Sequence, residues 1–232
     1  LVSSGDSVAV LTRDASKARC ILPSAVDIFE WDPYASPLPS DSLRDAAALV
    51  HLAGEPIMGL WTKAKRKRIF QSRILTTQSL VSALRETNNS QIRIVSASAV
   101  GFYGDRGSEL LTEEAQPGQG FIPDLVSAWE HSLAPLAGDG IDSTALRFGL
   151  VLSRHGGAFK QLLSPWKFGL GFKIGDGSQW WPWIHIEDAV GLIDYVLRGH
   201  ITVRVFNCVA PETVTQKIFA AELARTLSRP RL

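Results

Sequence analysis

The chain has 232 residues, 45% of them hydrophobic and 20% charged, and its formal net charge is +1. This size and composition indicate one domain with a sizeable core, and the near-neutral charge gives no global field that would attract nucleic acid or a membrane surface. No apolar run reaches the roughly 18 residues that a membrane helix needs. Cys20 and Cys208 lie far apart and indicate neither a disulfide framework nor a metal site. A reducing compartment, by default the cytoplasm, is therefore expected.

Apolar runs and helical periodicity alternate along the first ninety residues. Residues 7–12, 26–31 and 46–52 are predicted as strands, and the last is almost continuous in apolar residues, as in a buried parallel strand. Residues 63–85 repeat apolar side chains at intervals of three and four, which predicts one long helix. The basic start of this helix, residues 63–68, is interpreted as a solvated face.

Residues 91–105 combine a strand with polar and aromatic residues at its end. Ile92 to Val95 is a short β-branched run that predicts a buried strand. Ser96 and Ser98 follow it, and then Gly-Phe-Tyr-Gly at residues 101–104. In open α/β sheets ligands bind at the carboxyl edge of the strands, so these residues are expected at a site.

The second half of the chain continues the alternation. Helices are predicted at 124–136, 158–168, 189–197 and 214–227, and strands at 143–152 and 203–209. Asp188 is expected to cap the helix at 189–197. Residues 169–183 are rich in Gly and Trp and are predicted as an irregular loop of the kind that carries function.

Three stretches together resemble one protein family. Residues 96–105, Ser-Ala-Ser-Ala-Val-Gly-Phe-Tyr-Gly-Asp, resemble the strand-five signature of the extended short-chain dehydrogenases/reductases, the sugar-nucleotide epimerase group. The fit is closer to an atypical, epimerase-like branch that is often labelled cell-division inhibitors. Residues 50–57 and 179–188 agree, so the resemblance covers nearly the whole chain.

The resemblance implies the fold. A Rossmann-like, doubly wound α/β domain with a mainly parallel sheet is expected over residues 1–232, with a small substrate lobe mainly from 158–183 and 210–232. Family members begin with a strand and a Gly-rich loop that cradles the pyrophosphate, and they continue beyond an Arg-Pro like that at 229–230. Truncation at both ends is therefore expected, and an organelle stays open as the compartment.

A bound NADP is the cofactor that the resemblance and the residue types favour. Arg13 follows the strand that faces the adenosine ribose in a dinucleotide fold, where an Arg accommodates a 2′-phosphate and an acid would bond a 2′-hydroxyl. Without the family context, Arg13 would be an ordinary surface residue. Further cofactor contacts are expected from Thr12, Leu52, Ala53, Gly54, Arg68, Arg73, Ser96 and Val151.

The catalytic residues of the family are only partly present. Ser98 matches the serine that steadies the substrate oxygen, but residues 120–130, where a Tyr and a Lys four residues later are expected, contain neither. Tyr103 and His185 are candidate substitutes as the proton donor. The alternative for Tyr103 is an aromatic side chain that packs the loop, and the alternative for His185 is a structural histidine that hydrogen-bonds the backbone.

Two functions remain open at this point. The first is an NADP-dependent epimerase-like oxidoreductase of unknown substrate with a rebuilt acid/base site. The second is an NADP-binding sensor or partner-binding module without catalysis. A small-molecule substrate is expected in the first case, and neither nucleic acid nor a membrane in either case.

Overall fold

The computed structural model describes residues 1–87, 89, 91–167 and 174–228. Its centre is a four-stranded sheet in the order β3 (Ala48–His51), β4 (Arg93–Ala99), β5 (Ser143–Phe148) and β9 (Val205–Cys208). All three strand pairs are parallel. The expected α/β architecture with a mainly parallel, Rossmann-like sheet is therefore confirmed.

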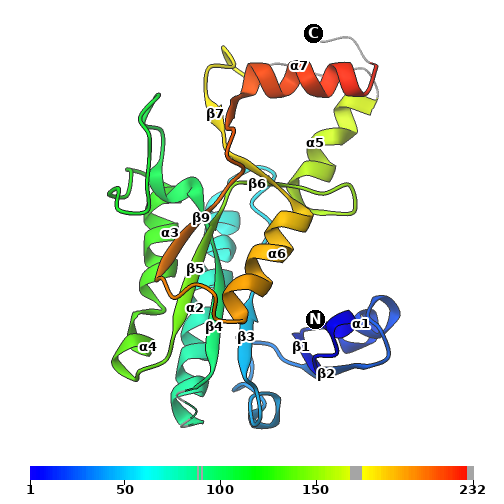
Figure 1. The fold of residues 1–232 in the computed structure, drawn as a ribbon, viewed down its shortest axis with the longest axis vertical. Coiled ribbons are helices and arrows are strands. Elements are labelled where there is room, and N and C mark those ends of the chain that lie inside the picture. Colours follow the sequence, from blue (N-terminus) through cyan, green and yellow to red (C-terminus); the bar gives the residue numbers. More distant parts are fainter. Residues whose placement is uncertain (88, 90, 168–173, 229–232) are drawn as a thin grey trace.

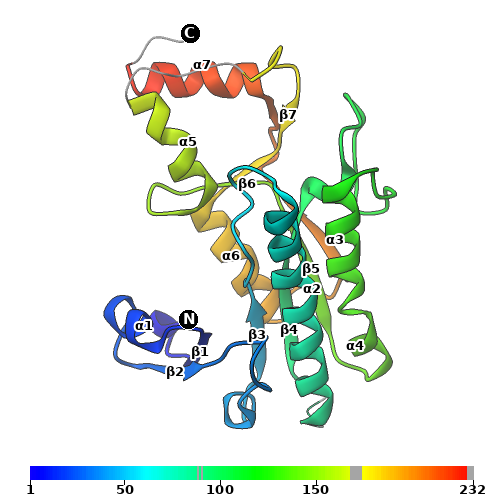
Figure 2. The same cartoon turned by 180° about the vertical axis from the view of Figure 1, so that it is seen from behind.

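Helices cover both faces of this sheet (Figures 1 and 2). The long helix α2 (Lys63–Glu86) and α3 (Phe121–His131) lie on one face, and α6 (Ile186–Leu197) lies on the other. Successive side chains of a strand point to opposite faces, and β4 follows this rule. Ile94 packs in one cluster with Leu80 of α2, and Val95 packs in another with Val196 of α6.

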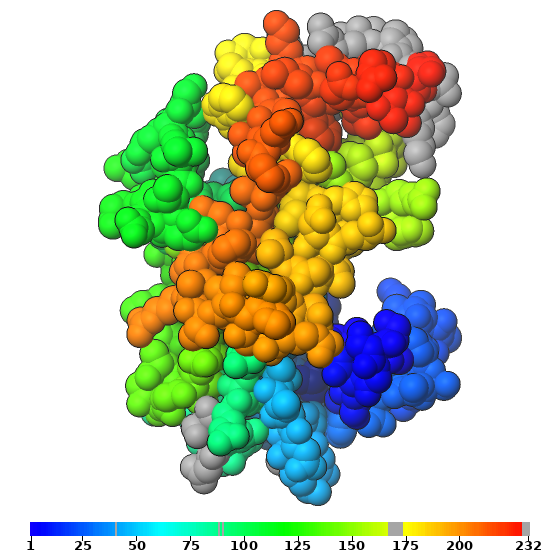
Figure 3. All heavy atoms as spheres, viewed as in Figure 1, coloured from blue at the N-terminus to red at the C-terminus, as the bar shows by residue number. Residues whose placement is uncertain are grey.

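The N-terminal segment forms a separate parallel pair. It contains the short 3-10 helix η1 (Val2–Ser4), then β1 (Val8–Thr12), α1 (Ala15–Ile21) and β2 (Val26–Glu30). Strand β1 pairs only with β2, and β3 pairs only with β4, so each has one unpaired edge in the described structure. A cavity of about 1560 Å³, here called the large cleft, is lined by both edges. In the space-filling view the dark blue N-terminal residues touch the main body near the end of α6, where Arg198 pairs with Asp6 (Figure 3).

Two predicted elements are interrupted. The strand expected at 143–152 breaks at Gly149 into β5 and β6 (Leu150–Leu152), and β6 pairs with β8 (Trp183–His185). The helix expected at 124–136 breaks after His131, and α4 (Ala134–Gly138) starts anew with Pro135 in its first turn. A proline lacks the amide that continues a helix, which explains the second break.

A small lobe at the end of the chain is built from α5 (Gly157–Lys167), β7 (Trp180–Trp181), β10 (Val214–Thr215) and α7 (Gln216–Thr226). Strand β10 pairs with β7, and Trp166 of α5 packs against Ala220 and Ala224 of α7. These elements fall in the ranges expected for the substrate lobe, of which 168–173 and 229–232 lie outside the described residues. Its role toward a substrate stays a prediction.

The remaining described elements are two short 3-10 helices, η2 (Ser40–Ser42) and η3 (Val100–Tyr103). Within the described ranges, no helix combines the length and the apolar character that crossing a bilayer would require.

Candidate functional site

Two cavities meet at the carboxyl ends of the central strands. The large cleft runs between β1 and β3, and a smaller one of about 220 Å³, here called the inner cavity, lies among the ends of β3 and β4 and the helices α2 and α3. Both are lined by Leu52, Ala53 and Gly54, which follow β3 directly. The two cavities therefore share one wall, formed by the segment from Leu52 to Gly54.

Besides this shared wall, three of the predicted cofactor residues line the large cleft. Thr12 and Arg13 line it from the end of β1, and Arg68 lines it from α2. Arg13 is exposed, and Arg68 is 58% exposed at its side chain. Both guanidinium groups are therefore accessible to a ligand in the cleft.

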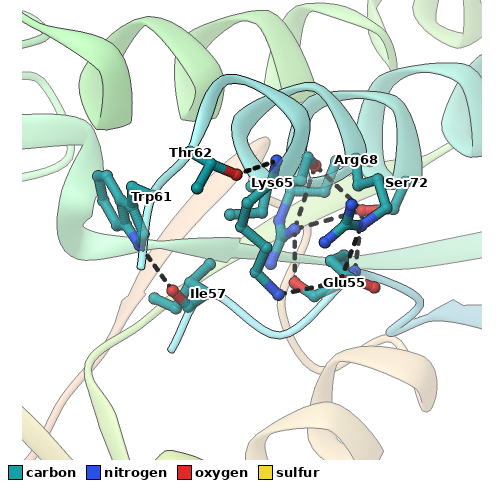
Figure 4. Close-up of polar contacts among 9 residues, drawn as sticks. Glu55, Ile57, Trp61, Thr62, Lys65, Arg68 and Ser72 are labelled. Carbon is teal, nitrogen blue, oxygen red and sulfur yellow. Dashed lines mark hydrogen bonds and ion pairs between the residues drawn. The ribbon is translucent and has the colours of Figure 1, made fainter. Parts of the chain in front are cut away.

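Glu55 ties the loop after Gly54 to helix α2 (Figure 4). Its carboxylate accepts a 2.9 Å hydrogen bond from Lys65 and lies 3.5 Å from Nε of Arg68, and its backbone amide donates to Ser72. These cations hold the pKa of Glu55 below its usual value, mainly through the hydrogen bond from Lys65. The loop that walls both cavities is thus fixed on α2.

Ser98 lines the inner cavity from the end of β4. Its hydroxyl donates a 2.5 Å hydrogen bond to Oε1 of Glu130 on α3, and its side chain is nearly buried. Glu130 in turn accepts two hydrogen bonds, at 2.8 and 2.7 Å, from the guanidinium of Arg147 on β5. Ser98 is therefore held in a buried ionic network.

Tyr103 belongs to the same network and does not line the inner cavity. Its hydroxyl donates to Oδ1 of Asn207 at 2.7 Å and accepts from Arg147 at 2.8 Å. The guanidinium of Arg147 also lies 3.5 Å from the ring centre of Phe102. Tyr103 thus has the packed position that the sequence left open as an alternative to an acid.

Ile122 and Val126 of α3 line the inner cavity together with Ser98. They are four residues apart, so they lie on one face of the helix, with the spacing of the family's Tyr and Lys. An aliphatic side chain can neither give nor take a proton. The described wall next to Ser98 therefore offers shape but no acid or base at these two positions.

Arg73 supplies the positive charge of the inner cavity. It stacks over Trp129 at 5.1 Å, and its Nη1 donates to the carbonyl oxygens of Glu55 and Ile69. Beneath it, a Cβ added to Gly54 would lie 3.1 Å from the guanidinium carbon, so the absence of a side chain there makes room for Arg73.

Besides Tyr103, three predicted residues line neither cavity. Ser96 is fully buried in β4, and Val151 of β6 packs in the cluster that contains Val95 and Leu146. His185 is half-exposed and caps α6, since its Nδ1 accepts a 3.3 Å hydrogen bond from the amide of Glu187. The cap expected at Asp188 is wrong, because α6 begins at Ile186, three residues before the expected start, and His185 is its N-cap. The functional roles assigned to these three residues stay predictions.

The sequence interpretation missed Glu130, Arg147 and Asn207. Glu130 is the last residue of the stretch 120–130, where the Tyr and Lys of the family were expected, and no motif pointed to a functional carboxylate at this position. Its pairing with Arg147 depends on α3 lying beside β5, which local patterns do not report. Among the described residues, no group of three His, Cys, Asp or Glu side chains is placed to hold a metal ion.

The model of the NAD dependent epimerase/dehydratase family matches residues 1–209. The human epimerase family protein SDR39U1 is 36% identical over 203 residues, which are 86% of this chain and 68% of that protein. Epimerase family protein YfhF of Bacillus subtilis is 30% identical over 231 residues, covering 99% of this chain and 75% of its own length. A crystal structure of human SDR39U1 with NADPH superposes with a TM-score of 0.83 at 32% identity, covering all of this chain and 76% of that one. A relative from Arabidopsis thaliana, 31% identical over 97% of this chain, is named as chloroplastic.

Proposed function

Because the chain belongs to the NAD dependent epimerase/dehydratase family, we propose that it is an NADP(H)-binding, epimerase-like oxidoreductase that acts on a small molecule. One observation carries the proposal: the segment Leu52 to Gly54 walls both the large cleft and the cavity of Ser98. A ligand bound along the large cleft would therefore have one end beside a hydroxyl group.

The residues of the large cleft fit a dinucleotide phosphate. Arg13 follows β1, the position from which an Arg accommodates a 2′-phosphate, and Arg68 offers a second exposed cation in the same cleft. Small residues at Ala53 and Gly54 let a cofactor approach the backbone. The NADPH in the human relative supports the choice of cofactor, although other structures of the same fold hold NAD.

Ser98 is the residue to which we assign the substrate oxygen. When bound, the nicotinamide would supply or accept the hydride, while Ser98 orients the oxygen at the reacting carbon. Tyr103 and His185 stay candidate proton donors, with their hydrogen bonds to Asn207 and to the Glu187 amide as the structural alternative. The cytoplasm remains the expected compartment, or an organelle as in the plant relative.

A second function is favoured by the aliphatic wall beside Ser98. Since Ile122 and Val126 cannot transfer protons, the protein would bind NADP(H) without turnover and act as a sensor or partner-binding module. Titration of the protein with NADPH and NADH, followed by a search for NADPH oxidation over a panel of aldehydes, ketones and quinones, separates the two. Cofactor binding with turnover supports the enzyme, binding without any turnover supports the sensor, and an absence of NADPH binding overturns both.

A further inference from the structure

The two arginines of helix α2 that were assigned to the cofactor open onto different cavities. Arg68 lines the large cleft, where it neighbours Ser72, and does not line the inner cavity. Arg73 lines the inner cavity with Ser98, and does not line the large cleft. Five residues along a helix place two side chains on different sides of it, so this separation follows from the helical repeat. The two cations therefore serve different ligands or different parts of one ligand.

The guanidinium of Arg73 is a partly buried charge without an ion pair in the described part of the chain. It donates hydrogen bonds to the backbone carbonyl oxygens of Glu55 and Ile69 and to the hydroxyl oxygen of Ser72, all of which are uncharged. The nearby carboxylate of Glu55 is occupied by Lys65 and Arg68. Burial lowers the pKa of Arg73, with Glu55 opposing this, but an arginine remains charged at neutral pH. Burying a cation without an anion is costly, and such positions often serve a charged ligand.

The rest of the inner cavity restricts what that ligand can be. Apart from Arg73 and Ser98 its lining is aliphatic or aromatic, with Ile122, Val126 and Trp129 among the contributing residues. Its volume of about 220 Å³ is below the 300–1,000 Å³ that is common for drug-sized ligands. The space therefore suits a short apolar group that carries one anionic end.

We infer that the inner cavity binds the carboxylate of a small organic acid, with Arg73 as its cationic partner and Ser98 beside the neighbouring oxygen. A carboxylate matches the planar guanidinium, and the atoms behind it would contact the apolar wall. The inference rests on the proposed function, because it makes the substrate a hydroxy or oxo acid. It assigns Arg73 to the substrate and leaves the cofactor phosphates to Arg13 and Arg68.

A pair of matched probes tests this assignment without any turnover. 2-Oxobutanoate and 2-oxobutanamide have nearly the same shape and differ in charge, and calorimetric titration of the cofactor-free chain compares their dissociation constants. The unmodified protein should bind the acid at least tenfold more tightly than the amide. Arg73→Gln should remove this preference, and Arg73→Lys should keep part of it. Lys67→Gln, an exposed position on the same helix, lowers the net charge equally and should leave the preference unchanged.

NADPH titration of the same variants separates the substrate from the cofactor as the source of the anion. Arg73→Gln should change NADPH affinity less than threefold. The inference is overturned if the unmodified protein binds acid and amide equally or binds neither. It is also overturned if Arg73→Gln weakens NADPH and leaves the acid preference intact, because the guanidinium would then serve a cofactor phosphate. If the unmodified protein prefers the acid but does not bind NADPH, the result supports the carboxylate site and contradicts the proposed function. Circular dichroism of each variant verifies that the chain is folded.

Discussion

The hydroxyl of Ser98 donates a 2.5 Å hydrogen bond to Glu130, so the residue assigned to the substrate oxygen is anchored on helix α3. Glu130 is held in turn by two hydrogen bonds from Arg147, whose side chain is only 3% exposed. Burial by itself would lower the pKa of Arg147, but its bonds to Glu130 and Tyr103 outweigh that effect and raise it. The carboxyl ends of β4 and β5 are thus joined through one carboxylate.

Loss of the Glu130 charge should destabilise the protein strongly. Glu130→Gln leaves the buried guanidinium of Arg147 without its anion, and breaking a buried ion pair costs about 3–5 kcal/mol. Urea denaturation of the variant and the unmodified chain measures this difference. Glu109→Gln, which breaks the exposed pair with Arg106, is the matched control and should change the unfolding free energy little. Equal effects of the two substitutions would contradict a stabilising role for the buried network.

Ser98→Ala should remove turnover and keep cofactor affinity. The hydroxyl lines the inner cavity, whereas the predicted phosphate contacts lie in the large cleft. Once a carbonyl substrate is found, kcat should fall below detection while the NADPH dissociation constant changes less than threefold. Ser98→Thr, which restores a hydroxyl, should recover part of the rate. Full kcat in the Ser98→Ala variant would show that Ser98 lies at the end of its strand without taking part in the reaction.

Arg13→Ala should weaken NADP(H) binding and leave NAD(H) binding almost unchanged. A hydrogen bond to a charged group contributes about 1.5–3 kcal/mol, so the loss should be about tenfold or more in affinity. Calorimetric titration with both cofactors measures the ratio. Lys63→Ala, at the start of α2, removes an exposed cation that lines neither cavity and serves as the control. If the unmodified protein binds both cofactors equally, the 2′-phosphate assignment fails.

The sequence was sufficient for elements whose cause is local. Of the predicted strand at 92–95, residues 93–95 are the start of β4, and the periodicity of 63–85 corresponds to α2 with one added residue. The inner cavity depended on tertiary packing. The hydrogen bonds that engage Ser98 and Tyr103 come from residues between 32 and 104 positions away, so no short pattern could reveal whether those hydroxyls are free.

His185 and the strand break at Gly149 illustrate two further limits. The histidine lies at a helix start, where its side chain accepts a hydrogen bond from an amide two residues later and so takes the capping role expected of Asp188. At the break, Gly149 packs against the backbone of Pro182, which lies 33 residues further along the chain. The sequence from 143 to 152 contains no sign of that neighbour.

Gly149→Ala should disrupt the junction between β5 and β6. An added Cβ would lie 2.5 Å from the carbonyl oxygen of Pro182, which is backbone and cannot rotate away. Overpacking of this kind typically costs about 1–3 kcal/mol, which urea denaturation would detect. Gly138→Ala at the end of α4 is the control, since a Cβ there meets no atom within 4 Å. That change should be neutral or slightly stabilising, because Ala favours helix more than Gly does. Comparable losses at both positions would contradict the steric argument.

His51 should make the stability of the protein fall with decreasing pH. It is buried at the end of β3, where Nε2 lies 3.0 Å from the hydroxyl of Thr77 and the ring packs edge-on against Trp129. Burial, and secondarily the charge of Arg73, lowers its pKa from 6.5 to about 4. The unfolded chain therefore binds a proton below pH 6.5 that the folded chain takes up only near pH 4. The stability that a neutral His51 provides is complete above pH 6.5 and is lost progressively as the pH falls toward 4.

From pH 7 to pH 5 this amounts to about 2 kcal/mol, at 1.36 kcal/mol for each pKa unit. Urea denaturation at both pH values measures the total change in the free energy of unfolding. The same measurement on His51→Gln, whose side chain can still hydrogen-bond Thr77, gives the part of this change that comes from the carboxylates. A variant with the same pH dependence as the unmodified protein would show that His51 does not cause it.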